Sequence, residues 1–106
     1  MKKTREFVRV IRGGKKVKTS FFTLSYQETP SQFLRLGIVV PKRVFKRAHD
    51  RNKAKRWIRE TFRREKHRLK SSYDLAVQVT HAPKDFYFHE VREELMALFE
   101  KAGLIQ

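Results

Sequence analysis

The residues of this chain that are best suited to chemistry are the cations between Arg51 and Arg63. In a helix, which turns by about 100° per residue, these cations and one amide lie along one arc of the surface. We call this set the basic arc, and its members are Arg51, Asn52, Lys55, Arg56, Arg59 and Arg63. Guanidinium groups bind phosphate oxygens at two points, lysine adds a point charge, and asparagine can bind a base edge or a sugar. The pattern predicts a phosphate-binding surface, although a merely solvated basic face would have the same residues.

The same stretch also carries an apolar face. Ala54, Trp57, Ile58, Thr61 and Phe62 gather on the side of the helix next to the basic arc. A helix divided in this way buries one face against a sheet and leaves the neighbouring face in solvent. We therefore expect Trp57 to belong to the core and the basic arc to be accessible.

The charge of the whole chain is large and uneven. A formal net charge of +15 over 106 residues indicates a polyanionic partner. Residues 1–70 hold 23 of the 26 basic residues and 5 of the 11 acidic ones, so the basic surface is expected on one side. With 40% apolar residues the chain is not a disordered basic tail, and its length predicts one domain over residues 1–106.

The sequence offers no catalytic constellation, so we expect no catalytic residue and no metal site in the protein. Its four histidines are scattered and show no metal-ligand spacing. His49-Asp50 is an adjacent acid–base pair, but helix capping or a surface position explains it more simply. Cysteine is absent, which suits a reducing cytoplasm, and no run approaches the roughly 18 apolar residues of a membrane span.

Two further groups of cations lie outside the basic arc. A basic loop leads directly into it, and we predict that this loop also binds a phosphate backbone through Lys42, Arg43, Lys46 and Arg47. Another group, Lys15, Lys16 and Lys18, follows two glycines. These lysines form either a flexible phosphate-binding loop or charge that only keeps the protein in solution.

Helices and strands that must position these groups alternate along the chain. Thr4 can cap a first helix that ends at Gly13-Gly14, and Asp50 can cap the basic helix, which should end near Leu69. Strands are expected over 17–26, 33–40 and 73–80, and a last amphipathic helix over 88–102. The result is a small mixed sheet covered by helices in the order αβββαβα, or αββαβα if residues 17–26 form one strand.

Two motifs give the chain a family resemblance. The first is Arg35-x-Gly37-Ile38-x-Val40-x-Lys42-Arg43, and the second is Ala48-His49-Asp50-Arg51-Asn52-x-x-Lys55-Arg56-x-x-Arg59-Glu60. In both, and in weaker similarity along essentially its whole length, the chain resembles the bacterial ribonuclease P protein family. The resemblance implies an α/β (α+β) two-layer sandwich with a left-handed βαβ crossover through the basic helix, against the usual right-handed preference.

The resemblance also implies a function. Family members bind a large catalytic RNA and together they remove the 5′ leader from precursor transfer RNA, while the RNA carries the chemistry and holds most of the Mg²⁺. We therefore expect a cytoplasmic, RNA-binding accessory subunit of this endoribonuclease, with the catalytic RNA and precursor tRNA as partners. No membrane and no obligate protein partner is implied. Arg51, Asn52 and Lys55 are expected on the leader side, and Arg56 and Arg59 on the side of the catalytic RNA.

Family members also receive the single-stranded leader in a cleft between the sheet and the first helix, where bases stack on aromatic and apolar side chains. The matching residues here are Phe7, Ile11, Val17 and Phe22. Ile11 stands where relatives often carry an aromatic residue and Ser25 where some carry tyrosine, so stacking is expected to be weaker. That all four side chains are plain core is an equally good interpretation.

Two other functions fit the composition. A ribosomal RNA-binding protein would share the size, charge and fold class, but it would lack the motif and the cleft. A DNA-binding module would need a helix that is free to enter a groove, whereas this basic helix buries its adjacent face against its own core.

Overall fold

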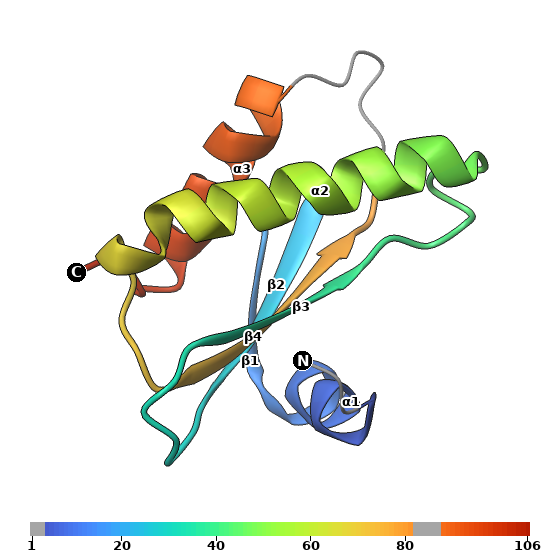
Figure 1. Ribbon diagram of the computed structural model, residues 1–106. Helices are drawn as coiled ribbons and strands as arrows, with labels where there is room; N and C mark the ends of the chain where they lie inside the picture. Colours follow the sequence, from blue (N-terminus) through green and yellow to red (C-terminus); the bar gives the residue numbers. More distant parts are fainter. Residues whose placement is uncertain (1–3, 82–87) are drawn as a thin grey trace.

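The computed structural model describes residues 4–81 and 88–106, with side chains from residue 8 onward in the first range. Its elements follow the expected order αβββαβα, with one short 3-10 helix added (Figure 1). They are α1 (Thr4–Gly13), β1 (Lys15–Lys18), β2 (Phe22–Glu28), β3 (Arg35–Val39), α2 (Ala48–Glu65), η1 (Lys66–Arg68), β4 (Tyr73–Val79) and α3 (Phe88–Lys101). The stretch 17–26 therefore belongs to two strands, because the chain turns at residues 19–21 and pairs back on itself.

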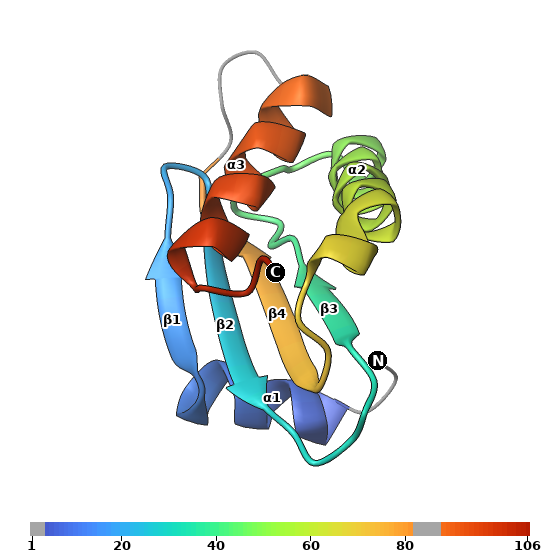
Figure 2. The ribbon, with the colours of Figure 1, turned by 90° about the vertical axis from the view of Figure 1, so that its left-hand side faces the viewer.

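The sheet is mixed and has the strand order β1-β2-β4-β3. β2 pairs antiparallel with both β1 and β4, whereas β3 and β4 are parallel. Figure 2 shows α2 and α3 on the near side of the sheet and α1 on the far side. In that view β3 and β4 both point upward, and the chain passes through α2 from β3 leftward to β4. The β3–α2–β4 connection is therefore left-handed, the uncommon hand that the family resemblance implied.

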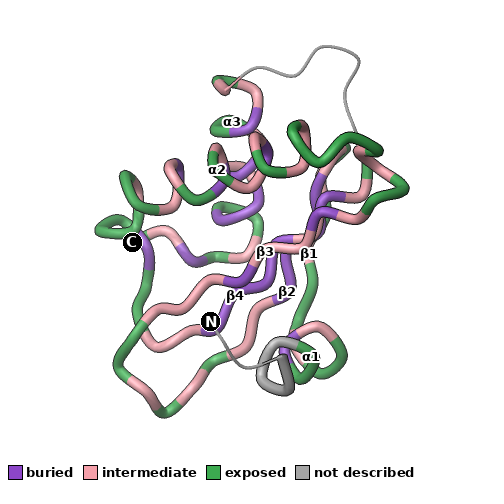
Figure 3. The backbone as a smooth tube through the Cα atoms, turned by 45° about the vertical axis from the view of Figure 1, so that its right-hand side comes forward, coloured by how far each residue is buried: buried purple, intermediate pink, exposed green. Residues whose placement is uncertain are grey.

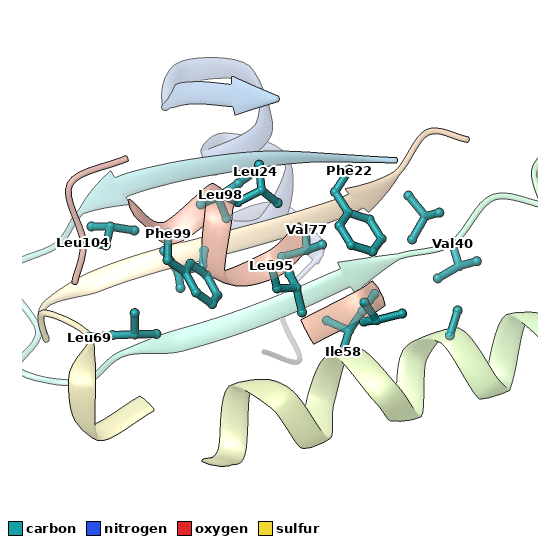
Figure 4. Packing of buried hydrophobic residues seen from close by; sticks show 14 residues of the cluster. Phe22, Leu24, Val40, Ile58, Leu69, Val77, Leu95, Leu98, Phe99 and Leu104 are labelled. Carbon is teal, nitrogen blue, oxygen red and sulfur yellow. The ribbon is translucent and has the colours of Figure 1, made fainter. Parts of the chain in front are cut away.

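The main core lies between the sheet and the layer of α2 and α3 (Figure 4). Because side chains alternate along a strand, Phe22 and Leu24 of β2 face this layer together with Val77 of β4, the cross-strand partner of Leu24. Leu95 and Phe99 of α3 close the core from above the sheet, and all five side chains are at most 1% exposed. Since these residues face α2 and α3, the residues that alternate with them along each strand face the other side of the sheet.

The ends of α2 differ from the prediction. The helix begins at Ala48, and the extended residue before it, Arg47, makes no side-chain capping bond. Asp50 lies inside the first turn, so the prediction that it caps the helix is wrong. At the other end the helix passes into η1, and Ser72 takes a positive φ of 68° before β4 begins.

The outward side of α2 is open to solvent. Buried and exposed residues alternate along it with the helical repeat (Figure 3), as its amphipathic sequence requires. Trp57 is only half-buried and packs edge-on against Phe88, with 6.0 Å between ring centroids. Among the described helices, none is long and apolar enough to cross a membrane.

Candidate nucleic-acid interface

The basic arc lies on the solvent side of α2. The neighbouring face holds the helix in place, because Ala54, Ile58 and Thr61 are at most 1% exposed. Within the arc, Asn52, Arg56, Arg59 and Arg63 are exposed, while Arg51 and Lys55 are half-buried. The exposed members recur at the three- and four-residue spacing that places side chains above one another on a helix, so they form one stripe.

Arg51 is tied to the protein main chain. Its Nη1 donates to the carbonyl oxygens of Phe45 and Lys46, each at 2.9 Å. These bonds fix the end of the basic loop against the first turn of α2. A guanidinium has further N–H groups, so Arg51 can hold the loop and still face a phosphate.

Most of the arc has no partner among the residues that the structure describes. Among the described side chains, no hydrogen bond or ion pair is made by Asn52, Lys55, Arg56 or Arg59. Their donors are therefore open to a ligand, and binding would not have to break an internal ion pair first.

Arg63 is different, because Glu60 binds it. Nε and Nη2 of Arg63 donate to the two carboxylate oxygens at 3.2 and 2.5 Å, and Arg64 Nε donates to one of them at 3.0 Å. The hydrogen bond from Arg63 lowers the pKa of Glu60, and the same bond raises the pKa of Arg63. Both groups stay charged at neutral pH, so Glu60 offsets part of the positive charge at this end of the arc.

A hollow of about 310 Å³ adjoins this end of the arc. Its lining consists of Arg56, Arg59, Glu60, Phe62, Arg63 and Lys66. Four cations therefore surround one carboxylate and one aromatic ring. That combination suits a phosphate group whose sugar or base contacts an apolar surface.

The basic loop extends the positive surface beyond the N-terminus of α2. All four predicted residues, Lys42, Arg43, Lys46 and Arg47, are exposed. The unsatisfied N–H groups of a helix N-terminus also attract anions. The structure therefore brings the basic loop and the basic arc together as one continuous surface.

The predicted leader-cleft residues whose side chains are described lie on different sides of the sheet. The side chain of Phe7 is outside the described residues, and Ile11 is half-buried on α1. Phe22 is 1% exposed and faces the layer of α2 and α3, across the sheet from α1. Val17 pairs with Leu24 and so points to the same side as Phe22. Phe22 and Val17 pack with the core, and their assignment to a cleft beside α1 is corrected.

The sheet face toward α1 is polar, and small residues occupy its centre. One cross-strand row consists of Lys16, Ser25, Ala76 and Gly37, and the next of Lys18, Thr23, Gln78 and Val39. Ser25 and Ala76 are fully buried, whereas Lys18 is exposed and Gln78 and Val39 are half-buried. Our sequence interpretation missed this second row, although the polar residues at alternate positions of β2 and β4 were a visible signal.

A second hollow, of about 320 Å³, lies where α1 meets the end of β2. It is lined by Arg9, Val10, Gln27, Glu28, Thr29, Pro30, Arg35 and Asp74. Arg35 binds Asp74 at two points, with Nε–Oδ1 and Nη2–Oδ2 distances of 2.8 Å. This ion pair fastens β3 to β4 at the start of their parallel pairing.

The lysines after Gly13-Gly14 belong to a strand. Lys15, Lys16 and Lys18 are all exposed on β1, which is an edge of the sheet. They therefore do not form a flexible loop, and exposed lysines on an edge strand also discourage pairing with other chains. Across residues 8–81 and 88–106, no three His, Cys, Asp or Glu side chains gather to hold a metal ion.

Comparison with known proteins gives consistent matches. The family model described as Ribonuclease P matches residues 1–103. The ribonuclease P protein component of Thermotoga maritima is 35% identical over 101 residues, which are 92% of this chain and 86% of that protein. The corresponding protein of Dictyoglomus turgidum is 37% identical over 108 residues, which are 100% of this chain and 90% of that protein.

Solved structures match over similar lengths. The Staphylococcus aureus RNase P protein superimposes with a TM-score of 0.90 at 28% identity, covering 100% of this chain and 96% of that one. The Thermotoga maritima RNase P protein, solved in complex with 1-(4-fluorophenyl)-2-thiourea, gives a TM-score of 0.83 at 31% identity. The match covers 95% of this chain and 97% of the Thermotoga maritima chain.

Proposed function

The chain belongs to the ribonuclease P protein family, and from that premise we propose how it acts. It is an RNA-binding protein subunit of a tRNA-processing endoribonuclease, and its partner is the ribonuclease P RNA. We propose that the basic loop and Arg56 and Arg59 of the basic arc bind this RNA. The 5′ leader of precursor tRNA is received by Arg51, Asn52 and Lys55 of the arc and by the sheet face toward α1. Hydrolysis of the leader belongs to the RNA.

The observation that carries this proposal is the stripe of unpaired donors on a rigid helix. Arg56 and Arg59 are exposed, have no partner among the described residues, and project from a helix whose other side is buried in the core. Side chains held in this way bind phosphates without first losing an ion pair or ordering a loop. A merely solubilising charge would not require such a fixed, one-sided arrangement.

The two ends of the basic arc suit two different RNA molecules, the precursor tRNA and the catalytic RNA. Arg51 and Asn52 lie beside the basic loop at the start of α2, where we place the leader. Arg56 and Arg59 lie further along, next to the hollow that contains Lys66, where we place the catalytic RNA. Phosphate contacts of this kind fix the register of an RNA without selecting its sequence.

The leader face beside α1 offers polar rather than aromatic contacts. Lys18 and Gln78 are accessible there and belong to the same cross-strand row. Lys18 can bind a leader phosphate, and Gln78 can bind a base or sugar. Ile11 of α1 is half-buried and supplies apolar surface.

We assign no chemical step to a protein side chain. Three of the described carboxylates, Asp74, Glu60 and Glu65, are each bound to arginine. These carboxylates form no oxygen cluster of the kind that Mg²⁺ needs, so we propose that the RNA subunit holds the Mg²⁺. We also propose a cytoplasmic location and no obligate protein partner.

Recovery of bound RNA from cells tests the proposal. The tagged full chain should enrich ribonuclease P RNA, together with precursor tRNA that retains its 5′ leader. Enrichment of ribosomal RNA alone would contradict it and favour a ribosomal role. The Arg56→Ala/Arg59→Ala variant serves as the matched control, since it should lose the ribonuclease P RNA while still folding.

A further inference from the structure

A third hollow, of about 230 Å³, lies at the opposite end of the sheet from the basic loop. It is lined by Gly13, Gly14, Lys15, Tyr26, Gln27, Glu28 and Tyr73. None of these residues belongs to the basic arc or the basic loop. We call it the Tyr26–Tyr73 pocket.

Strand register places four of its side chains on one face. Lys15 is the cross-strand partner of Tyr26, and Glu28 is that of Tyr73. Tyr26 and Glu28 are alternate residues of β2, so all four point to the side of the sheet away from α1. These four side chains therefore lie on the other side of the sheet from the face that we propose for the leader.

The two tyrosines form an open aromatic corner. Their ring centroids are 6.3 Å apart, and the ring planes are inclined by 52°. Both side chains are half-buried, and neither hydroxyl makes a hydrogen bond to any described residue. Buried tyrosine hydroxyls usually find a partner, so these rings offer both a stacking face and free polar groups.

Charges of opposite sign flank the corner. Lys15 and Glu28 are exposed, and neither forms an ion pair with another described side chain. Gly14 allows the turn after α1 to close tightly on β2, because a Cβ there would lie 2.6 Å from the Tyr26 carbonyl oxygen. The pocket thus has a fixed wall, an aromatic floor, one cation and one acceptor.

We propose that the Tyr26–Tyr73 pocket binds one unpaired nucleotide of RNA. The base stacks on a tyrosine ring, Lys15 binds its phosphate, and Glu28 accepts a hydrogen bond from an N–H group of the base edge. Stacking tolerates any base, and each base carries at least one N–H donor, so the site selects for single strands rather than for sequence. The proposal rests on the RNA-binding role of the chain but on none of the contacts assigned to the basic arc.

Fluorine NMR of the full chain labelled with 3-fluorotyrosine tests this site. The sequence has three tyrosines, so three resonances are expected, and Tyr→Phe substitutions assign them. Titration with AMP should shift the resonances of Tyr26 and Tyr73, whereas ribose 5-phosphate, which lacks a base, should not. Unchanged resonances with AMP, or equal shifts with the sugar phosphate, would overturn the proposal.

Two substitutions separate binding from folding. Tyr73→Leu should weaken AMP binding about 5- to 150-fold, the effect of losing one base-stacking contact. Tyr73→Phe keeps the ring and should retain most of the affinity, so a loss in both variants to the same extent would count against stacking. Thermal unfolding of each variant establishes that it is folded during the titration.

The Arg56→Ala/Arg59→Ala variant distinguishes this site from the proposed arc contacts. It should bind the catalytic RNA more weakly and respond to AMP as the unchanged chain does. If the AMP response is normal and the RNA affinity is unaltered, the proposed contacts of the basic arc are contradicted, and the proposal for the pocket is not. Loss of the AMP response in this folded variant would contradict the pocket, because it would place the AMP site on the basic arc.

Discussion

The guanidinium of Arg51 holds the main chain of Phe45, since its Nη1 donates to the Phe45 carbonyl oxygen at 2.9 Å. The same nitrogen donates to the next carbonyl, that of Lys46, at an equal distance. Arg51, a member of the basic arc, therefore stabilises the basic loop, which extends the positive surface of the arc. Its removal should affect both the fold and the binding surface, unlike removal of the solvent-facing cations.

Arg51→Ala should destabilise the protein by about 1 to 2 kcal/mol, because two carbonyl oxygens lose a charged donor at a partly exposed site. Urea unfolding measures the change. Lys55→Ala removes the same charge from the same helix without breaking any hydrogen bond to the described residues, so it should change stability far less. Equal losses in the two variants would show that Arg51 is simply another surface cation.

Arg56→Ala/Arg59→Ala should weaken binding to the catalytic RNA and flatten its dependence on salt. Each lost phosphate contact lowers the slope of log K against log salt concentration by about one, so the double variant should lose about two. Filter binding at several salt concentrations measures the slope. Arg92→Ala is the control, because Arg92 lies on α3 and binds Glu65. An unchanged slope in the double variant would identify Arg56 and Arg59 as solvated charge.

The Glu60 ion pairs should make stability depend on pH in the acid range. Glu60 has a lowered pKa, chiefly through its hydrogen bond from Arg63, so its contribution is present above the ordinary value of 4.5. It is lost as pH falls through the lowered pKa in the folded state. The difference in unfolding free energy between the wild type and Glu60→Gln should therefore shrink as the pH falls below 4.5. The difference should also shrink in high salt, because the pair is exposed. A pH-independent difference would contradict this role.

Several features of the fold could be predicted because they depend on local pattern. The alternation of Leu75, Val77 and Val79 predicted β4 and its buried face, which the structure confirms. The break between β1 and β2 was harder to locate, since Val17 is the single apolar residue of β1. The start of α2 was placed too late because the main chain before it is held by Arg51 rather than by a capping side chain.

The cleft residues could not be assigned from sequence, because their position depends on tertiary arrangement. Alternation shows that Phe22 and Ser25 point to opposite sides of β2, but it does not show which side α1 covers. Strand order and the left-handed crossover decide that, and both arise from contacts between distant segments. The basic arc was easier, since a single helix carries all its members and their shared face follows from the helical repeat.

Phe22→Ala should act on stability rather than on leader recognition. The side chain is 1% exposed, and its loss leaves a cavity beneath α2 and α3, so we expect destabilisation of about 3 to 5 kcal/mol. Chemical unfolding measures the change, and Phe22→Leu should be milder because it refills part of the cavity. At a temperature where the variant is folded, affinities for precursor and mature tRNA should change together. A selective loss of precursor binding in a variant of normal stability would restore Phe22 to the leader site.

Ile11→Phe should strengthen recognition of the leader. Ile11 is half-buried on α1, beside the face that we propose for the leader, and the larger phenylalanine ring can stack on a base. One added stacking contact is worth about 1 kcal/mol at the lower end of its range, which is roughly a fivefold gain in affinity. The gain should appear for precursor tRNA bound to the reconstituted enzyme and not for mature tRNA. Val8→Phe adds the same ring at an exposed position of α1 and is the matched control. If both variants tighten both tRNAs alike, the added ring acts through general RNA affinity, and the leader does not pass beside Ile11.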